Sequence, residues 1–174
     1  KKGYFILSGV FESKDCEKII SEANKIKEKD NNYLPLMNPH KNSKSIMEAM
    51  GNKTIIRFIE SYFKNEAYGL QTEFFFMPPH TKGFTPHQDN TYVQADENSF
   101  VSAWVALTDV NEKNGGLIIW PMSHKEKKLQ SLENIEEKSF NQDPNARSRI
   151  TILPDSYKKI TPSIKKGDVI MIHS

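Results

Sequence analysis

The sequence contains a single cysteine, Cys16, among its 174 residues. A lone thiol forms neither an internal disulfide nor a thiolate metal cage, and this usage is typical of a reducing compartment, so we expect a cytoplasmic location. No apolar run approaches the ~20 residues that cross a bilayer, and the start lacks a signal-peptide pattern, so we expect no membrane span. The net charge is only +2, with lysines interleaved among acidic residues, which argues against a nucleic-acid partner. None of these features fixes an oligomeric state.

Repeats and low-complexity tracts are also absent, and hydrophobic residues make up 37% of the chain. This length and composition predict a single domain with one sizeable core. We expect helical support over residues 1–66 and strands over residues 67–174. The last β-rich run, Val169 to Ser174, has no terminating signal, and Lys1 is not an initiator methionine. We therefore expect a trimmed chain whose domain continues beyond Ser174.

The periodicity of apolar residues predicts the elements within this domain. A short strand at residues 4–10 leads into a helix after the predicted N-cap Ser13, and helical spacing returns over residues 46–63. The polar residues 30–44 between them are expected to form a loop in which His40 is exposed. Strand-like patterns then cover residues 70–77, 100–107, 117–121, 150–153, 157–164 and 169–173. Helices followed by about six short strands predict helices that flank a β-sandwich or barrel.

The stretch from Phe84 to Tyr92 carries the clearest chemical motif, a histidine and a carboxylate at His87 and Asp89. Pro86 disfavours helix here, and side chains at i and i+2 of an extended strand point the same way. The two side chains are therefore expected to converge on one ion. A mixed N/O pair completed by a third ligand is how non-haem Fe(II) oxygenases hold iron. This spacing alone is a weak signal, and its weight depends on the surrounding sequence.

The predicted strand before this motif carries two polar side chains, Gln71 and Glu73, on the same face as Phe75 and Met77. Buried polar groups need partners. The pair therefore lies either at a pocket or on a solvated face, and the sequence leaves both alternatives open. His80, in the following loop, is expected to be exposed.

Five blocks occur in one order along the chain: His87-Gln88-Asp89, Ser102 to Leu107, Asn114 to Leu117, Pro121 to Lys125 and Lys166 to Val169. Together they resemble the phytanoyl-CoA dioxygenase family, over roughly residues 68–174. Members are Fe(II)/2-oxoglutarate-dependent oxygenases on a double-stranded β-helix, a jelly-roll, cupin-like barrel. The resemblance implies a mainly β fold with flanking helices.

By this resemblance, His87 and Asp89 are the first two Fe(II) ligands. Gln71, Trp104 and Tyr92 would lie at the 2-oxoglutarate pocket, although Trp104 and Tyr92 also suit an ordinary aromatic core. The implied activity is hydroxylation of a small-molecule substrate with O₂, 2-oxoglutarate giving succinate and CO₂. Asp89 favours hydroxylation because halogenating relatives replace this carboxylate with a small residue.

The chain departs from the family pattern at three places. Met122 stands where the turn Pro-Gly-Ser-His usually has glycine. The distal iron histidine, and the arginine that pairs with 2-oxoglutarate, are expected beyond Ser174. His173 lies before that histidine, and strand parity places it with Val169 and Met171 on the face opposite the ligand position. His173 is therefore expected to neighbour the site or to pack within the strand.

Two other classes remain open: a cupin-like metal enzyme independent of 2-oxoglutarate, and a non-catalytic small-molecule-binding jelly-roll module. Specificity is expected from loops at residues 32–48, 91–98 and 126–148, the last within a charged segment that suggests an insertion or lid. No clustered basic loop suits the phosphates of coenzyme A, so we expect a small metabolite rather than a CoA thioester as substrate.

Overall fold

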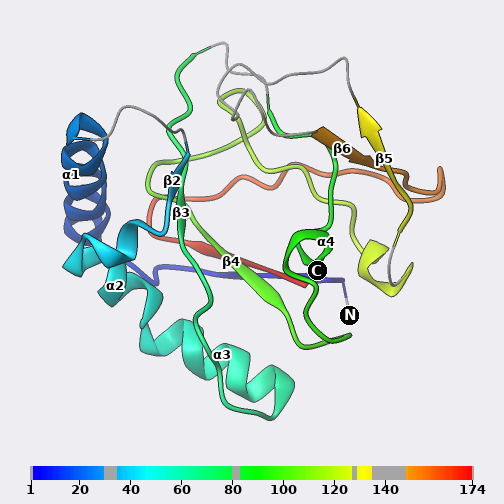
Figure 1. Ribbon diagram of the computed structural model, residues 1–174, viewed down its shortest axis with the longest axis horizontal. Coiled ribbons are helices and arrows are strands. Elements are labelled where there is room, and N and C mark those ends of the chain that lie inside the picture. The colour runs from blue at the N-terminus through cyan, green and yellow to red at the C-terminus, as the bar shows by residue number, and fades with distance from the viewer. Residues whose placement is uncertain (1, 30–34, 80–82, 127–128, 135–147, 174) are drawn as a thin grey trace.

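The computed structural model describes residues 2–29, 35–79, 83–126, 129–134 and 148–173. Helices α1, α2 and α3 gather to one side of the central strands, and the β5–β6 pair lies on the other side (Figure 1). No helix within these ranges is long and apolar enough to cross a bilayer. The elements in chain order are β1 (Tyr4–Leu7), α1 (Ser13–Lys29), β2 (Leu36–Met37), the 3-10 helix η1 (Pro39–Lys41), α2 (Lys44–Met50), α3 (Lys53–Phe63), β3 (Glu73–Phe74), α4 (Asn90–Val93), β4 (Val101–Val105), the 3-10 helix η2 (Ser123–Glu126), β5 (Ser131–Asn134), β6 (Ser148–Thr151) and β7 (Val169–His173).

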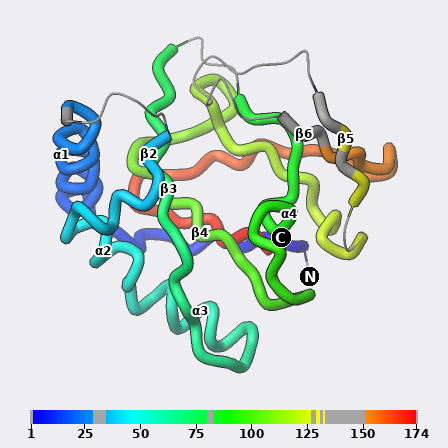
Figure 2. The backbone as a smooth tube through the Cα atoms, viewed as in Figure 1, coloured from blue at the N-terminus to red at the C-terminus, as the bar shows by residue number. Residues whose placement is uncertain are grey.

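The central sheet has the order β1-β7-β4, and both outer strands run antiparallel to β7. Tyr4 pairs with Ile172, and Trp104 pairs with Ile170. The first and last strands therefore lie side by side, although they come from opposite ends of the sequence (Figure 2). Two further two-stranded sheets, β2–β3 and β5–β6, complete the described strands.

Strand β7 is buried on both faces, which explains its continuous apolar sequence. Val169 and Met171 pack with Phe11, Cys16 and Ile55 on the helical side. The alternate residue Ile170 packs on the other side, in a cluster with Ala106, Ile119, Ile164 and Trp104. The sheet thus separates a helix-facing side from an inner side, and burial of each such apolar side chain stabilises the fold by ~1.5–3 kcal/mol.

The helices form largely where the periodicity predicts. Cys16, Ile19 and Ala23 lie at helical spacing on α1 and are buried. The predicted helical stretch 46–63 is divided into α2 and α3, because the Asn52 side chain accepts hydrogen bonds from the backbone of Thr54 and Ile55 and starts a new helix.

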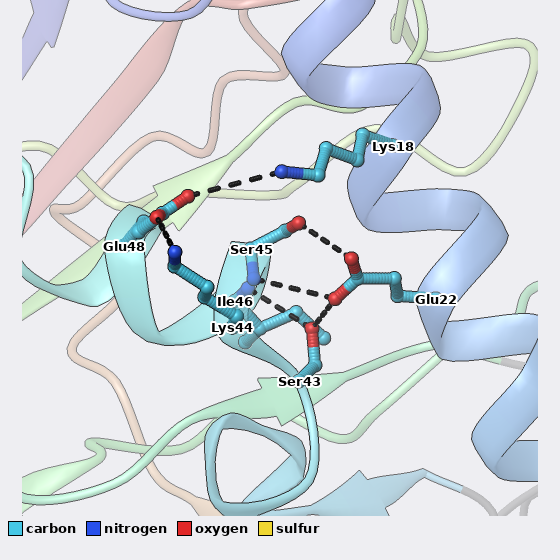
Figure 3. Close-up of polar contacts among 7 residues, drawn as sticks. All are labelled: Lys18, Glu22, Ser43, Lys44, Ser45, Ile46 and Glu48. Atoms are coloured by element: carbon cyan, nitrogen blue, oxygen red, sulfur yellow. Dashed lines mark hydrogen bonds and ion pairs between the residues drawn. The ribbon is translucent and has the colours of Figure 1, made fainter.

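A carboxylate clamp joins α1 to the start of α2 (Figure 3). The Glu22 carboxylate accepts hydrogen bonds from the hydroxyls of Ser43 and Ser45, and from the Ser45 backbone at 3.2 Å. Ser43 is also the N-cap of α2, since its oxygen accepts from the Ile46 backbone at 3.1 Å. The Ser43 and Ser45 hydroxyls hold the pKa of Glu22 below its ordinary value. Both serines are buried, so the clamp fixes where the chain enters α2.

The segment before α2 is attached to β3. The Asn38 backbone donates to the Thr72 carbonyl at 2.7 Å, and His40 Nδ1 lies 2.8 Å from the Thr72 hydroxyl. His40 is half-buried rather than exposed as the sequence suggested. The carboxylate clamp and these bonds therefore position the backbone that carries Gln71 and Glu73.

The strand predictions are confirmed at β1, β4 and β7, the one at residues 150–153 overlaps β6, and the others are too long. Residues 70–77 contain only the two-residue strand β3, and residues 117–121 and 157–164 meet through the isolated bridge between Ile119 and Ile160. Residues 131–134, expected in an insertion or lid, form β5 and pair with β6. No closed barrel is present in the described part of the chain. His80 and residues 135–147 lie outside it.

The turn from Pro121 to His124 keeps a left-handed backbone without glycine. Met122 has a φ of 73°, and its backbone donates to the Lys2 carbonyl at 2.7 Å. The departure from the family pattern therefore leaves the turn conformation intact, with Met122 in a region that disfavours side chains with a Cβ.

Candidate metal centre

The loop before α4 fixes the orientation of the His87 ring. His87 Nδ1 lies 2.7 Å from the carbonyl oxygen of Thr85. A carbonyl only accepts hydrogen bonds, so Nδ1 carries a proton and donates it. His87 Nε2 then faces Oδ1 of Asp89 at 3.1 Å. In a neutral His87 this tautomer leaves the Nε2 lone pair directed at the carboxylate side of the site.

The predicted convergence of His87 and Asp89 is present, but the reason given for it was wrong. Asp89 has helical dihedral angles, φ −57° and ψ −36°, and is the residue before α4. The Tyr92 backbone donates to the Asp89 carbonyl at 3.0 Å. A helical turn, and not the alternation of an extended strand, therefore brings the carboxylate back toward the imidazole.

Ser102 on β4 holds the second oxygen of Asp89. Its hydroxyl donates to Oδ2, on the inner face of the sheet that Ser102 shares with Trp104. Sequence reasoning missed Ser102, although its position two residues before Trp104 on a strand was a usable signal. The carboxylate is thus fixed by β4 through one oxygen and faces His87 with the other.

The two side chains perturb each other's protonation. Hydrogen bonding to Asp89 raises the pKa of His87, while burial opposes that rise. Burial alone would raise the pKa of Asp89, but the hydrogen bonds from His87 and Ser102 outweigh it, and the pKa lies below its ordinary value. About a third of each side chain remains exposed, 32% and 36%. Without a metal, these shifts favour the imidazolium–carboxylate form of the pair, and water partly screens the contact.

The donor set fits a metal ion. Two ligands at right angles, each ~2.1 Å from a cation, would be ~3.0 Å apart, close to the 3.1 Å between Nε2 and Oδ1. The Nδ1–H bond to a backbone carbonyl is also the usual support of a metal-bound histidine. Within the described ranges no group of three His, Cys, Asp or Glu side chains could hold a metal. The described chain supplies two candidate ligands.

Contacts from β6 and the β5 side hold this loop in place. The Thr151 backbone donates to the Pro86 carbonyl at 2.7 Å, and the Leu129 backbone donates to Gln88 Oε1 at 2.9 Å. The geometry of His87 and Asp89 therefore depends on residues more than 40 positions further along the chain.

The three residues predicted to bind 2-oxoglutarate, Gln71, Tyr92 and Trp104, lie in different surroundings. Tyr92 is 58% exposed, and its ring meets His87 edge to face at 5.8 Å. Gln71 Nε2 donates to Glu73 Oε1 at 2.9 Å. Trp104 packs in the inner core cluster with Ile119, Ile164 and Ile170. The structure thus brings Tyr92 against His87 and places Trp104 in the core.

Gln71 and Glu73 are both exposed, so the solvated alternative that the sequence left open applies to them. Burial and the Asp89 carboxylate raise the pKa of Glu73, and His87 opposes that rise. The Glu73 carboxylate is therefore electrostatically coupled to the His87–Asp89 pair.

His173 lies on the helix-facing side of β7. Its ring centroid is 6.1 Å from that of Tyr62, 6.4 Å from that of Phe63 and 5.2 Å from that of His124. Its strand neighbour Ile172 pairs with Ser102, which faces inward to Asp89. His173 therefore shares the helix-facing side of the sheet with Val169 and Met171, as strand parity predicted, while Ser102 faces Asp89 from the other side.

Comparisons with known sequences point to one protein family. The sequence model of the family described as phytanoyl-CoA dioxygenase (PhyH) matches residues 1–174. A rice protein (Oryza sativa subsp. japonica) named phytanoyl-CoA dioxygenase 1 is 30% identical over 106 residues, 60% of this chain and 35% of the rice protein. An Arabidopsis thaliana phytanoyl-CoA dioxygenase is 40% identical over 57 residues, 32% of this chain and 20% of that protein. The matches thus span about a third or less of these relatives' lengths.

Two solved structures share the fold. One is described as the non-heme alpha ketoglutarate-dependent epimerase SnoN from nogalamycin biosynthesis, with a TM-score of 0.60 and 17% identity, covering 99% of this chain and 68% of SnoN. The other is SnoN in complex with Fe3+, alpha ketoglutarate and nogalamycin RO, with a TM-score of 0.63 and 15% identity, covering 99% and 70%. At these identities the likeness concerns the fold.

Proposed function

This chain belongs to the phytanoyl-CoA dioxygenase family, and we propose that it is part of a non-haem Fe(II)- and 2-oxoglutarate-dependent oxygenase that acts on a small molecule. His87 and Asp89 are its first two iron ligands. Strands β1, β4 and β7 belong to the jelly roll that carries the site.

The observation that carries this proposal is the 3.1 Å approach of His87 Nε2 to Asp89 Oδ1. Thr85 fixes the ring from one side, and Ser102 fixes the carboxylate from the other. Both donors are therefore preorganised before a metal arrives, which reduces the cost of binding. Bound Fe(II), with 2-oxoglutarate and O₂, would supply the oxidising chemistry and release succinate and CO₂.

The other predicted site residues, Gln71, Tyr92 and Trp104, help to form the pocket around the iron. Gln71 is a polar contact for 2-oxoglutarate at the edge of the centre, and Tyr92 borders its mouth. Trp104 closes the inner face below Ser102 and helps to exclude water. These assignments rest on the family resemblance and on the position of each side chain.

Hydroxylation is the favoured outcome, because Asp89 occupies the coordination position that a halide would need. A solved structure with the same fold is described as an epimerase, which makes inversion at a carbon centre the second candidate. Product analysis separates these outcomes, since hydroxylation adds an oxygen atom and epimerisation leaves the composition unchanged.

The test uses the intact gene product, loaded with Fe(II) without oxygen and then given 2-oxoglutarate and O₂. Replacement of either ligand, His87→Ala or Asp89→Ala, should abolish iron retention and succinate production while the circular dichroism stays near that of the parent. Glu112→Ala, at an exposed carboxylate in a turn outside the predicted specificity loops, is the matched control and should keep both activities. Parental turnover of 2-oxoglutarate in either ligand variant would contradict the assignment.

The same measurements address the two competing classes. A metal enzyme independent of 2-oxoglutarate would retain iron but produce no succinate. A non-catalytic binding module would bind a small molecule without either result.

A further inference from the structure

The segment formed by β3 and the two residues after it, residues 73–76, presents two different faces. Phe74 and Phe76 pack against the helical cluster that contains Ile19 and Leu36. Glu73 and Phe75 alternate with them, so these two side chains point away from the helices. Glu73 therefore lies on the same side of the segment as Phe75, which contacts Phe84 beside His87, and the Asp89 carboxylate contributes to the raised pKa of Glu73.

A row of aromatic rings extends from the end of β3 to the His87–Asp89 pair. Phe75 meets Phe84 at 5.2 Å with an interplanar angle of 81°, and Phe84 meets His87 at 6.4 Å and 65°. Tyr92 meets the same imidazole at 5.8 Å and 71°. All these contacts are edge-to-face, and the three aromatic side chains remain 36%, 44% and 58% exposed.

Exposed aromatic side chains that touch one another and border a metal site are typical of a ligand-binding surface. His87 lies within the row, so an apolar ligand held by these rings would lie beside the metal. The rings thus provide the apolar wall of a substrate site.

Glu73 gives that wall a charge. Its Oε1 accepts a hydrogen bond from Gln71, and within the described ranges neither a lysine nor an arginine forms an ion pair with it. A carboxylate beside aromatic rings attracts a cation twice, through its own charge and through the electron-rich ring faces. An anionic group placed beside Glu73 would instead be repelled by its carboxylate.

We propose that the substrate of this oxygenase carries a positively charged nitrogen on an apolar body, the nitrogen held by Glu73 and the body by Phe75, Phe84 and Tyr92. This inference rests on the proposed function, since it names the substrate class of the same site. Glu73 is then a specificity-determining residue.

The test uses three probes with one apolar body and different charges: 3-phenylpropylamine, 3-phenylpropan-1-ol and 3-phenylpropanoate. Their binding to the intact Fe(II)- and 2-oxoglutarate-loaded protein is measured without oxygen by calorimetry. The amine should bind roughly tenfold more tightly than the alcohol, as one favourable charge contact implies, and the carboxylate should bind most weakly. Equal binding of amine and alcohol, or tightest binding of the carboxylate, would overturn the proposal.

Substitutions separate the contribution of the Glu73 charge to binding from that of the aromatic rings. Glu73→Gln should remove the preference for the amine over the alcohol, and Glu73→Asp should restore part of it. Phe84→Ala should weaken the amine and the alcohol by the same factor. Glu66→Gln, an exposed carboxylate that accepts a hydrogen bond from Tyr68, is the matched control and should keep the preference. An unchanged preference in Glu73→Gln would overturn the proposal.

Glu73 could instead serve only to orient Gln71 toward 2-oxoglutarate. A raised KM for 2-oxoglutarate in Glu73→Gln, with an intact amine preference, would show this and refute the cation site. Iron retention and 2-oxoglutarate consumption, measured in parallel without probes, distinguish failure of the proposed oxygenase function from failure of the substrate class. Their absence overturns the oxygenase and its substrate class together, whereas their presence without an amine preference overturns the substrate class alone.

Discussion

Ser102 and Asp89 are joined by a hydrogen bond from the serine hydroxyl to Oδ2, while Oδ1 of the same carboxylate faces His87. The two oxygens therefore have separate partners. A metal bound by His87 would meet Oδ1, while Oδ2 would keep its hydrogen bond to Ser102. This arrangement favours binding of the metal through one oxygen of Asp89.

Ser102→Ala should weaken metal binding without removing it. Loss of a group that orients a ligand typically costs about 10–100-fold in affinity, and the carboxylate would be free to rotate. Co(II) or Fe(II) titration measures the change. Ser99→Ala is the control, because its hydroxyl donates to the Asp96 carbonyl in the neighbouring loop. Equal affinities of the parent and Ser102→Ala would show that Ser102 does not orient the ligand.

His173→Gln should leave iron binding in place. His173 packs against Tyr62 and Phe63 on the helix-facing side, opposite the face of Ser102 and Asp89. We expect at most a modest loss of stability or rate. A structure of the intact iron-bound protein with a His173 nitrogen ~2.0–2.2 Å from the metal would contradict this expectation.

His173 and His124 should make the protein less stable in mild acid. Burial lowers the pKa of both rings below the ordinary value of 6.5, and for His124 the neighbouring His173 adds to the effect. The unfolded chain then binds protons more readily than the folded chain, so stability present above pH 6.5 falls as the pH drops below it. The neighbours Tyr62, Phe63 and Lys125 carry no carboxylate that would raise the pKa of either histidine and offset the effect of burial.

Urea unfolding at several pH values measures this dependence. The free energy of unfolding should fall less steeply with acidification in His173→Gln and in His124→Gln than in the parent. A parental slope in both variants would show that these rings do not control the acid response.

Met122→Gly should stabilise the protein. A residue with a Cβ at a φ of 73° carries a penalty of ~1–2 kcal/mol that glycine avoids, partly offset by the greater freedom of glycine in the unfolded chain. We expect a net gain of ~0.5–1 kcal/mol by urea unfolding. Met37→Gly, at an exposed methionine outside the positive-φ region, should destabilise. A loss of stability in Met122→Gly would indicate that its side-chain contacts outweigh the strain.

Glu22→Ala should cost far more than Glu48→Ala. Removal of Glu22 leaves the buried hydroxyls of Ser43 and Ser45 without their acceptor, at ~1–3 kcal/mol. Glu48 makes only exposed ion pairs with Lys18 and Lys44, at 3.9 and 3.8 Å, which contribute ~0–1 kcal/mol. Chemical denaturation of both variants measures the difference, and equal losses would show that the clamp is not specific.

Local patterns in the sequence predicted the parts of the fold that depend on near neighbours. The spacing of Cys16, Ile19 and Ala23 gave α1, and the continuous apolar run from Val169 gave β7. The parity of His173 followed from the same regular strand. These features depend on backbone periodicity, which the sequence displays directly.

Features that depend on distant partners were not predictable. Ile119 bridges Ile160, and the His87 loop is held by Leu129 and Thr151, so neither arrangement is visible in a short window. Asp89 was expected on a strand because Pro86 disfavours helix, yet Pro86 lies before the turn and leaves Asp89 helical. The ligand roles of His87 and Asp89, and the cofactor roles of Gln71, Trp104 and Tyr92, stay predictions.

The rate at which the single thiol of Cys16 is alkylated can measure how often the core opens. Its side chain is fully buried between α1 and β7, beside Phe11 and Met171, and burial raises the pKa of the thiol. An alkylating reagent reaches the sulfur only when helix and sheet separate, and the thiolate is the reactive form. Each molecule has one thiol and is alkylated once. The labelling rate under native conditions therefore reports how often α1 and β7 separate.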